Sequence, residues 1–146
     1  MRPDVVGERG VSAISGLEFA KAVARIAGER HAEEVVVLDL RGLSAVTDFF
    51  VIGTGTSDRQ MRAIIDEVEA FGDRVGQRRF GLSGYDSATW LLADYVDVVL
   101  HLFDGPRREY YDLELLWGDA PRVDGVMSSA ETTATGATVP EETKRT

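Results

Sequence analysis

The sequence contains no cysteine, which excludes disulfides and thiolate metal sites and fits a reducing compartment. It also lacks any apolar run long enough to cross a bilayer. The first residues, MRPDVVGERGVSA, have no continuous apolar core of the kind a signal peptide needs. We therefore expect a cytoplasmic protein that does not associate with membranes.

Positive charge is scarce as well. Lys and Arg number 16 against 25 Asp and Glu, so the formal net charge is −9. This balance argues against direct binding to a nucleic-acid backbone, which depends on clustered basic side chains. An acidic protein can still act on a nucleoprotein particle by docking on one of its basic protein components. Acidity also keeps a protein soluble, and this simpler explanation stays open.

Histidine is nearly absent, and His31 and His101 are not spaced as a metal-binding pair. A zinc site is not expected with so few ligands. The sequence has no G-x-S-x-G elbow, so no Ser-His-Asp triad can be argued. His31 is expected at a helix end, and His101 within a strand, where it is either a hydrogen-bonded sheet residue or part of a docking face.

The length and the apolar fraction of 44% suit a single globular domain. Residues 1–13 mix Gly, Pro and charges without periodicity, and we expect them to be flexible. The tail 124–146 is rich in Ser, Thr, Ala and Glu and is predicted to be disordered. The folded domain is therefore predicted to span residues 14–123.

Two S-x-x-E/Q capping boxes mark helix starts within this domain. Ser15 with Glu18 opens a first helix, and Ser57 with Gln60 opens a second that should stop near Gly72. A last helix begins after Asp104-Gly105-Pro106. Its predicted packed face consists of Tyr110, Leu113, Leu116 and Trp117, although Tyr110 and Tyr111 cannot both face the core.

Apolar, β-branched runs predict five strands, over residues 35–40, 49–52, 79–82, 90–93 and 96–103. Val98–Leu100 lies in the most continuous apolar stretch, which is typical of a central strand. The order of elements predicts a mixed β-sheet of about five strands flanked by helices, in the α/β or α+β class.

A glycine-rich loop, GTGTS at residues 53–57, lies between a predicted strand and a helix and suggests a phosphate-binding loop. It lacks the Gly-Lys-Ser/Thr ending of a Walker loop, and Asp58 stands where a dinucleotide fingerprint needs glycine. A carboxylate there satisfies the helix dipole and repels phosphate. A tight turn with a helix cap is the favoured interpretation, and nucleotide binding the lesser one.

Seven segments, in order and spacing, resemble the Iojap family, the bacterial ribosomal silencing factors. The resemblance covers about residues 17–123, with Val96 standing where family members more often have Gly. The matching segments are LDLRGLS (38–44), TDFFVI (47–52), SDRQ (57–60), GY (84–85), W (90), DYVDVVLHLF (94–103) and YYDLELLWGDAP (110–121).

This resemblance implies a nucleotidyltransferase-like Iojap fold. It also implies a factor that binds the large ribosomal subunit through the ribosomal protein numbered fourteen in the bacterial series. The bound factor would obstruct the small subunit sterically and so repress translation, without catalysis and without a cofactor. Members tend to form homodimers.

The fold relationship raises an alternative, a metal-dependent nucleotidyltransferase. That chemistry needs carboxylates two residues apart on one strand face to hold the metal. Asp39 stands alone, and Asp94 and Asp97 are three apart, which on a continuous strand would point them to opposite faces. The spacing therefore disfavours this alternative, which rests mainly on fold analogy.

The segment from Gly84 to Pro121 is the predicted partner-binding region. Its acidic residues would face a basic patch on the ribosomal protein, and its aromatic residues would supply anchors. The competing interpretation is that the aromatics simply pack the sheet. The predicted partner-binding residues are Tyr85, Asp86, Trp90, Asp94, Tyr95, Asp97 and His101.

Overall fold

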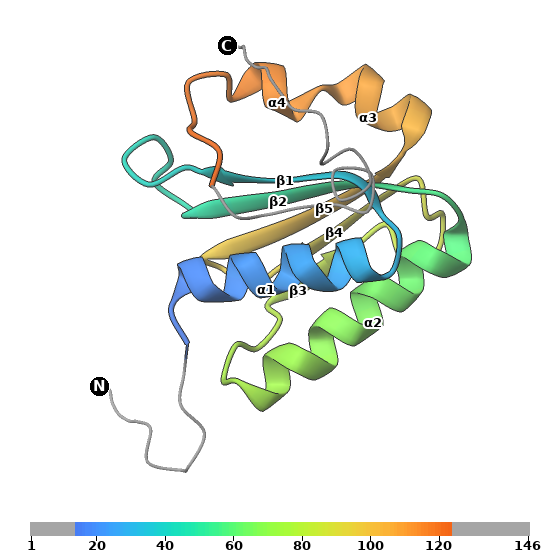
Figure 1. Cartoon of the computed structure of the whole chain (residues 1–146), viewed down its shortest axis with the longest axis horizontal. Helices are drawn as coiled ribbons and strands as arrows, with labels where there is room; N and C mark the ends of the chain where they lie inside the picture. The colour runs from blue at the N-terminus through green and yellow to red at the C-terminus, as the bar shows by residue number, and fades with distance from the viewer. Residues whose placement is uncertain (1–13, 124–146) are drawn as a thin grey trace, which may run out of the picture.

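The computed structural model describes residues 14–123, so the predictions for residues 1–13 and 124–146 lie outside the described part of the chain. A five-stranded mixed sheet has helices on both faces (Figure 1), which confirms the predicted fold class. The elements in order are α1 (Gly16–Glu29), β1 (Glu33–Asp39), β2 (Phe49–Gly55), α2 (Asp58–Arg74), β3 (Gly81–Ser83), β4 (Trp90–Asp94), β5 (Val98–Asp104), α3 (Gly105–Tyr111) and α4 (Leu113–Leu116).

The strands lie in the order β1-β2-β5-β4-β3, so β5 is central. Strand β5 runs parallel to β2 and antiparallel to β4. Its first six residues are all buried, as a strand covered on both faces requires. The prediction of a central strand at Val98–Leu100 is confirmed.

Helices α1 and α2 cover one face of the sheet (Figure 1). Both capping boxes form as predicted: Ser15 Oγ accepts from Glu18 N at 3.1 Å, and Ser57 Oγ accepts from Gln60 N at 3.0 Å. Helix α2 runs two residues past the predicted stop at Gly72. A Cβ on Gly72 would lie 2.4 Å from the Gln77 carbonyl oxygen, so this glycine serves a close backbone approach.

Helices α3 and α4 lie over the other face (Figure 1), where a smaller core forms around Leu38, Leu40, Ile52 and Phe103. None of the helices among residues 14–123 is long and apolar enough to cross a membrane.

The prediction of one continuous last helix is wrong. Asp112 adopts a left-handed conformation, with φ of +44°, which ends α3 and begins α4. Its Oδ1 accepts from Leu115 N at 3.2 Å and so caps the second helix. The break turns the chain, and Tyr110 and Leu116 are 80% and 73% exposed instead of packed.

The start of the predicted last strand is also wrong. Residues 95–97 form a turn between β4 and β5, and Val96 in that turn has φ of +74°. A β-branched residue is strained in this region, which glycine adopts freely. Valine at position 96, where family members more often have Gly, therefore strains a turn. From the sequence, we had expected it only to stiffen the start of a strand.

Candidate docking surface

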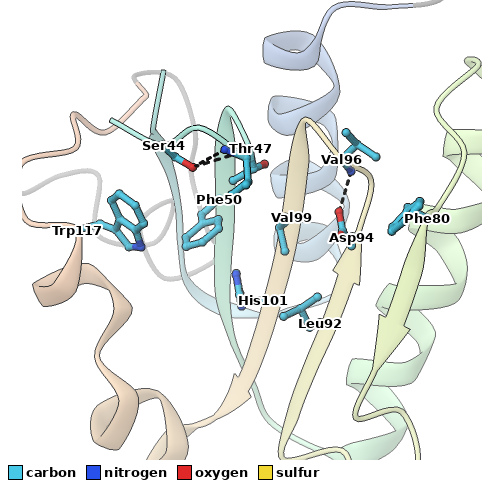
Figure 2. Close-up of a pocket in the computed structure, with 11 residues that line it drawn as sticks. Ser44, Thr47, Phe50, Phe80, Leu92, Asp94, Val96, Val99, His101 and Trp117 are labelled. Carbon is cyan, nitrogen blue, oxygen red and sulfur yellow. Dashed lines mark hydrogen bonds between the residues drawn. The ribbon is translucent and has the colours of Figure 1, made fainter. Parts of the chain in front are cut away.

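Helices α3 and α4 leave part of their sheet face uncovered, and a groove of about 520 Å³ lies there. Phe50 of β2, Leu92 of β4 and Val99 of β5 line it (Figure 2). These side chains share a face because their strands pair in register: Phe50 lies opposite Val99, and Leu92 lies opposite His101. Grooves of this size and apolar character are typical binding sites.

Exposed apolar side chains surround the groove. Val46 is 82% exposed, Phe80 77% and Val96 51%. Trp117 lines both this groove and a neighbouring hollow, so the two lie side by side. That hollow is bordered by three more exposed leucines, Leu43, Leu115 and Leu116.

We call this surface, the groove together with Leu43, Leu115 and Leu116, the docking face. Isolated exposed apolar residues are common on proteins, whereas a contiguous set marks an interaction surface. The geometry therefore suits contact with a macromolecule over a broad area.

His101 lies at the groove and is only 4% exposed. Its Nδ1 accepts a hydrogen bond from Trp90 Nε1 at 3.1 Å, which assigns the proton of the neutral ring to Nε2. Burial lowers the pKa of His101 to about 4, so the ring is neutral at physiological pH. Nε2 has no hydrogen-bond partner among the described residues, and neither does Thr47 Oγ1 at the same groove.

Asp94 also lines the groove, at the end of β4, and its Oδ1 accepts from Val96 N at 2.8 Å (Figure 2). Asp97 lies in the turn beyond it, and its carbonyl accepts from Asp48 N and Phe49 N. The sequence argument that treated Asp94 and Asp97 as members of one strand was therefore wrong, because β4 ends between them.

Comparison with known proteins gives this surface a context. A family model described as "Ribosomal silencing factor during starvation" matches residues 14–146. The chain belongs to the RsfS family. The resemblance seen in the sequence is confirmed.

The ribosomal silencing factor RsfS of Bacillus subtilis is 42% identical over 104 residues, which make up 71% of this chain and 88% of that protein. A solved structure from Bacillus halodurans matches with a TM-score of 0.61 and 38% identity, over 74% of this chain and 95% of that one. A crystal structure from Chromobacterium violaceum matches with a TM-score of 0.69 and 27% identity, over 81% of this chain and 98% of that one.

The RsfS-family fold separates the seven residues predicted to bind a partner. Asp94 and His101 line the groove. Trp90 lies next to His101 but is half-buried, with its ring centroid 4.5 Å from that of Tyr111 and 4.9 Å from that of Phe103. It therefore supports the docking face from beneath α3.

Tyr95 is only 3% exposed and packs against Phe19, with ring centroids 5.0 Å apart, on the side of α1 and α2. Burial raises the pKa of its hydroxyl to about 12. This position corrects its predicted role as an anchor, because a partner cannot reach it. The competing interpretation, that it packs the sheet, holds for Tyr95.

Tyr85 and Asp86 lie in a loop fixed to α2, away from the docking face. Arg62 donates from Nε to the Tyr85 carbonyl at 2.8 Å and from Nη2 to the Asp86 carbonyl at 2.6 Å. The Tyr85 hydroxyl lies 3.2 Å from each carboxylate oxygen of Asp66. These contacts show that Tyr85 and Asp86 attach their loop to α2.

The exposed residues Val46, Phe80, Leu115 and Leu116 were not predicted as contacts. Their signal in the sequence is weak: the spacing does not require Val46, Phe80 or Leu115 to be buried, and it wrongly placed Leu116 in the packed face of the last helix. Only the fold shows that they gather on one side.

The glycine-rich segment, residues 53–57, has the structure of a strand end followed by a helix cap, in line with the favoured interpretation. Gly53 and Gly55 belong to β2, and a Cβ on Gly55 would lie 2.1 Å from Met61 Cγ. The loop then leads into the Ser57 cap of α2. Within residues 14–123, no group of three or more His, Cys, Asp or Glu side chains is arranged to hold a metal ion.

The free energy of unfolding should fall as the pH drops from about 6.5 toward 4. In this range His101 is protonated in the unfolded chain but stays neutral in the folded chain, because burial lowers its pKa. The unfolded state carries more protons in this window, so lower pH favours unfolding. The full contribution is about 3 kcal/mol. Urea unfolding of wild type and His101→Gln at pH 7, 5.5 and 4.5 measures it. Equal pH slopes in the two proteins would contradict the assignment.

Val96→Gly should change stability and docking in opposite directions. Glycine relieves the strained turn and should raise the unfolding free energy by about 1 kcal/mol. It also removes an exposed apolar side chain from the groove, so a macromolecule that docks there should bind roughly fivefold more weakly. Thermal unfolding and titration measure the two effects. Val96→Ala is the control, because it removes most of the side chain yet keeps most of the strain.

Proposed function

We propose that this chain is a ribosomal silencing factor that binds the large ribosomal subunit and blocks its association with the small subunit, which represses translation. One observation carries the proposal: a chain of the RsfS family presents a broad apolar docking face with the acidic residue Asp94 at its groove. The action is steric. It needs neither catalysis nor a cofactor, and it takes place in the cytoplasm, where ribosomes work.

The chemistry of the docking face favours a basic protein as the partner. Exposed apolar side chains supply the central contact, and Asp94, which lines the groove, supplies negative charge beside it. The chain as a whole carries a net charge of −9, which would steer a basic partner toward it. We propose ribosomal protein fourteen of the large subunit as this partner. In the free protein, the same apolar face favours a homodimer.

Sucrose-gradient co-sedimentation tests the proposal. The chain should travel with purified large subunits and not with small subunits. It should also bind isolated ribosomal protein fourteen, and high salt should weaken that contact. If the chain stays at the top of the gradient when large subunits are present, and if it does not bind isolated ribosomal protein fourteen, the proposal is wrong.

A further inference from the structure

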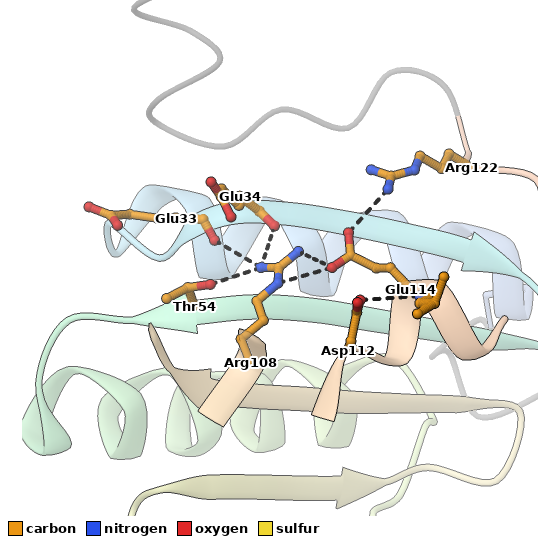
Figure 3. A network of polar contacts seen from close by, with 8 residues as sticks. Glu33, Glu34, Thr54, Arg108, Asp112, Glu114 and Arg122 are labelled. Carbon is orange, nitrogen blue, oxygen red and sulfur yellow. Dashed lines mark hydrogen bonds and ion pairs between the residues drawn. The ribbon is translucent and has the colours of Figure 1, made fainter. Parts of the chain in front are cut away.

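Arg108 of α3 joins four elements of the fold although it is only 8% exposed. Its Nη1 donates to the Glu34 carbonyl at 2.7 Å and to Thr54 Oγ1 at 2.9 Å. Its Nε and Nη2 donate to Glu114 Oε1 at 3.1 and 3.0 Å (Figure 3). One guanidinium thus connects α3 to β1, β2 and α4. We call these contacts the Arg108 clasp.

Strand β1 is shaped to receive this side chain. Its pairing with β2 shifts register between Glu33 and Val36, and Glu34 has φ of +51°. The irregularity turns the carbonyls of Glu33 and Glu34 toward the same guanidinium (Figure 3). A positive φ is unfavourable for a residue with a side chain, and charge-assisted hydrogen bonds offset that cost.

The rest of α3 and α4 contributes little burial. Arg108 is the one buried residue of α3, and α4, which the structure describes in full, has none. Leu113 and Trp117 pack only partly against the smaller core. Apart from the ring contacts of Tyr111 with Trp90 and Phe103, the position of these helices on the sheet therefore depends mainly on the Arg108 clasp.

Helix α4 carries Leu115 and Leu116, the most exposed leucines of the docking face. An interface residue binds well when it is already held in its bound position, because ordering it during binding lowers affinity. The Arg108 clasp holds α4 through Glu114, whose other oxygen, Oε2, accepts from Arg122 Nη2 at 3.1 Å.

We propose that Arg108 is a positioning residue of the docking face, which fixes α3 and α4 so that Leu115 and Leu116 meet the partner preorganised. This role rests on the proposed function, since the large subunit is the partner whose affinity it sets. Arg108 itself is covered and makes no contact with that partner.

The test compares Arg108→Met with wild type by hydrogen exchange and by binding to large subunits. Methionine keeps much of the side-chain length but makes none of the hydrogen bonds. Exchange across residues 105–117 should be at least about tenfold faster, while α1, α2 and β5 stay protected. Affinity for large subunits should fall about tenfold or more. Glu114→Gln, a milder change, should shift both readouts in the same direction but less.

A double-mutant cycle separates positioning from mere stability. Leu115→Ala should weaken binding clearly in wild type and much less in Arg108→Met, because a mobile α4 no longer presents Leu115. Additive effects, or unchanged binding despite faster exchange, would overturn the positioning role. Unchanged exchange in both variants would overturn the clasp itself. If wild type does not bind large subunits, the proposed function and the positioning role are both wrong. The exchange data still show whether the Arg108 clasp holds α3 and α4 on the sheet.

Discussion

Two positive charges on the docking face, Phe80→Arg with Leu116→Arg, should abolish binding to the large subunit. Each substitution removes a large exposed apolar side chain, 77% exposed for Phe80 and 73% for Leu116. Each also sets a like charge against the basic partner that we propose. Losing two interface anchors at about 2 kcal/mol each corresponds to an affinity loss on the order of 1,000-fold.

The same variant should keep its fold, because both positions are exposed and surface substitutions change stability little. Co-sedimentation with large subunits gives the affinity, and circular dichroism checks the fold. The matched control is Ala70→Arg with Ser87→Arg, which adds the same charge at exposed positions of α2 and of the loop that packs on it. Equal loss of binding in both variants would mean that charge, and not the docking face, sets the affinity.

Gly84→Ala should destabilise the fold by roughly 2–4 kcal/mol, since it combines backbone strain with a clash. Gly84 has φ of +80°, and an added Cβ would lie 2.0 Å from the Trp90 carbonyl oxygen. That oxygen belongs to strand β4 and cannot move without disturbing the pairing with β5. Urea unfolding at pH 7 measures the loss.

Gly42→Ala provides the control for this prediction. Gly42 has nearly the same conformation, with φ of +84°, but nothing lies within 4 Å of an added Cβ. It should therefore show the strain alone, about 1 kcal/mol. If the two variants lose equal stability, the close approach of Gly84 to β4 does not constrain the fold.

Local signals in the sequence were sufficient for much of the fold. The Ser15 and Ser57 caps depend on contacts three residues away, so a short stretch of sequence is enough to predict them. The central strand β5 is similarly marked by a continuous apolar run. These features are decided by neighbouring residues, and their predictions are confirmed.

The predictions that were wrong depend on where a turn falls. Asp112 breaks the last helix, and that single left-handed residue decides which way Tyr110 and Leu116 point. The turn at Val96 separates Asp94 from Asp97. A turn of this kind has no periodic pattern, and the sign at Val96, where family members more often have Gly, was interpreted as a stiffer strand and not as a turn at positive φ.

The candidate site was predicted only in part for a similar reason. The sequence offered aromatic and acidic residues, and two of them, Asp94 and His101, lie at the groove. The exposed apolar residues of the docking face come from α4 and from the segments that precede or join the strands, and the sheet topology alone brings them together. Tyr95 shows the converse, because an aromatic residue near a turn was taken for an anchor and is core.

We propose that the chain represses translation by keeping the ribosomal subunits apart. Light scattering of purified large and small subunits, mixed with and without the chain and without any added nucleotide, tests it most directly. Equimolar chain should lower the extent of subunit joining, and the double variant Phe80→Arg with Leu116→Arg should restore it. Unimpaired joining with wild type would show that the chain does not keep the subunits apart. An effect that requires a nucleoside triphosphate and metal and releases pyrophosphate would instead indicate a nucleotidyltransferase.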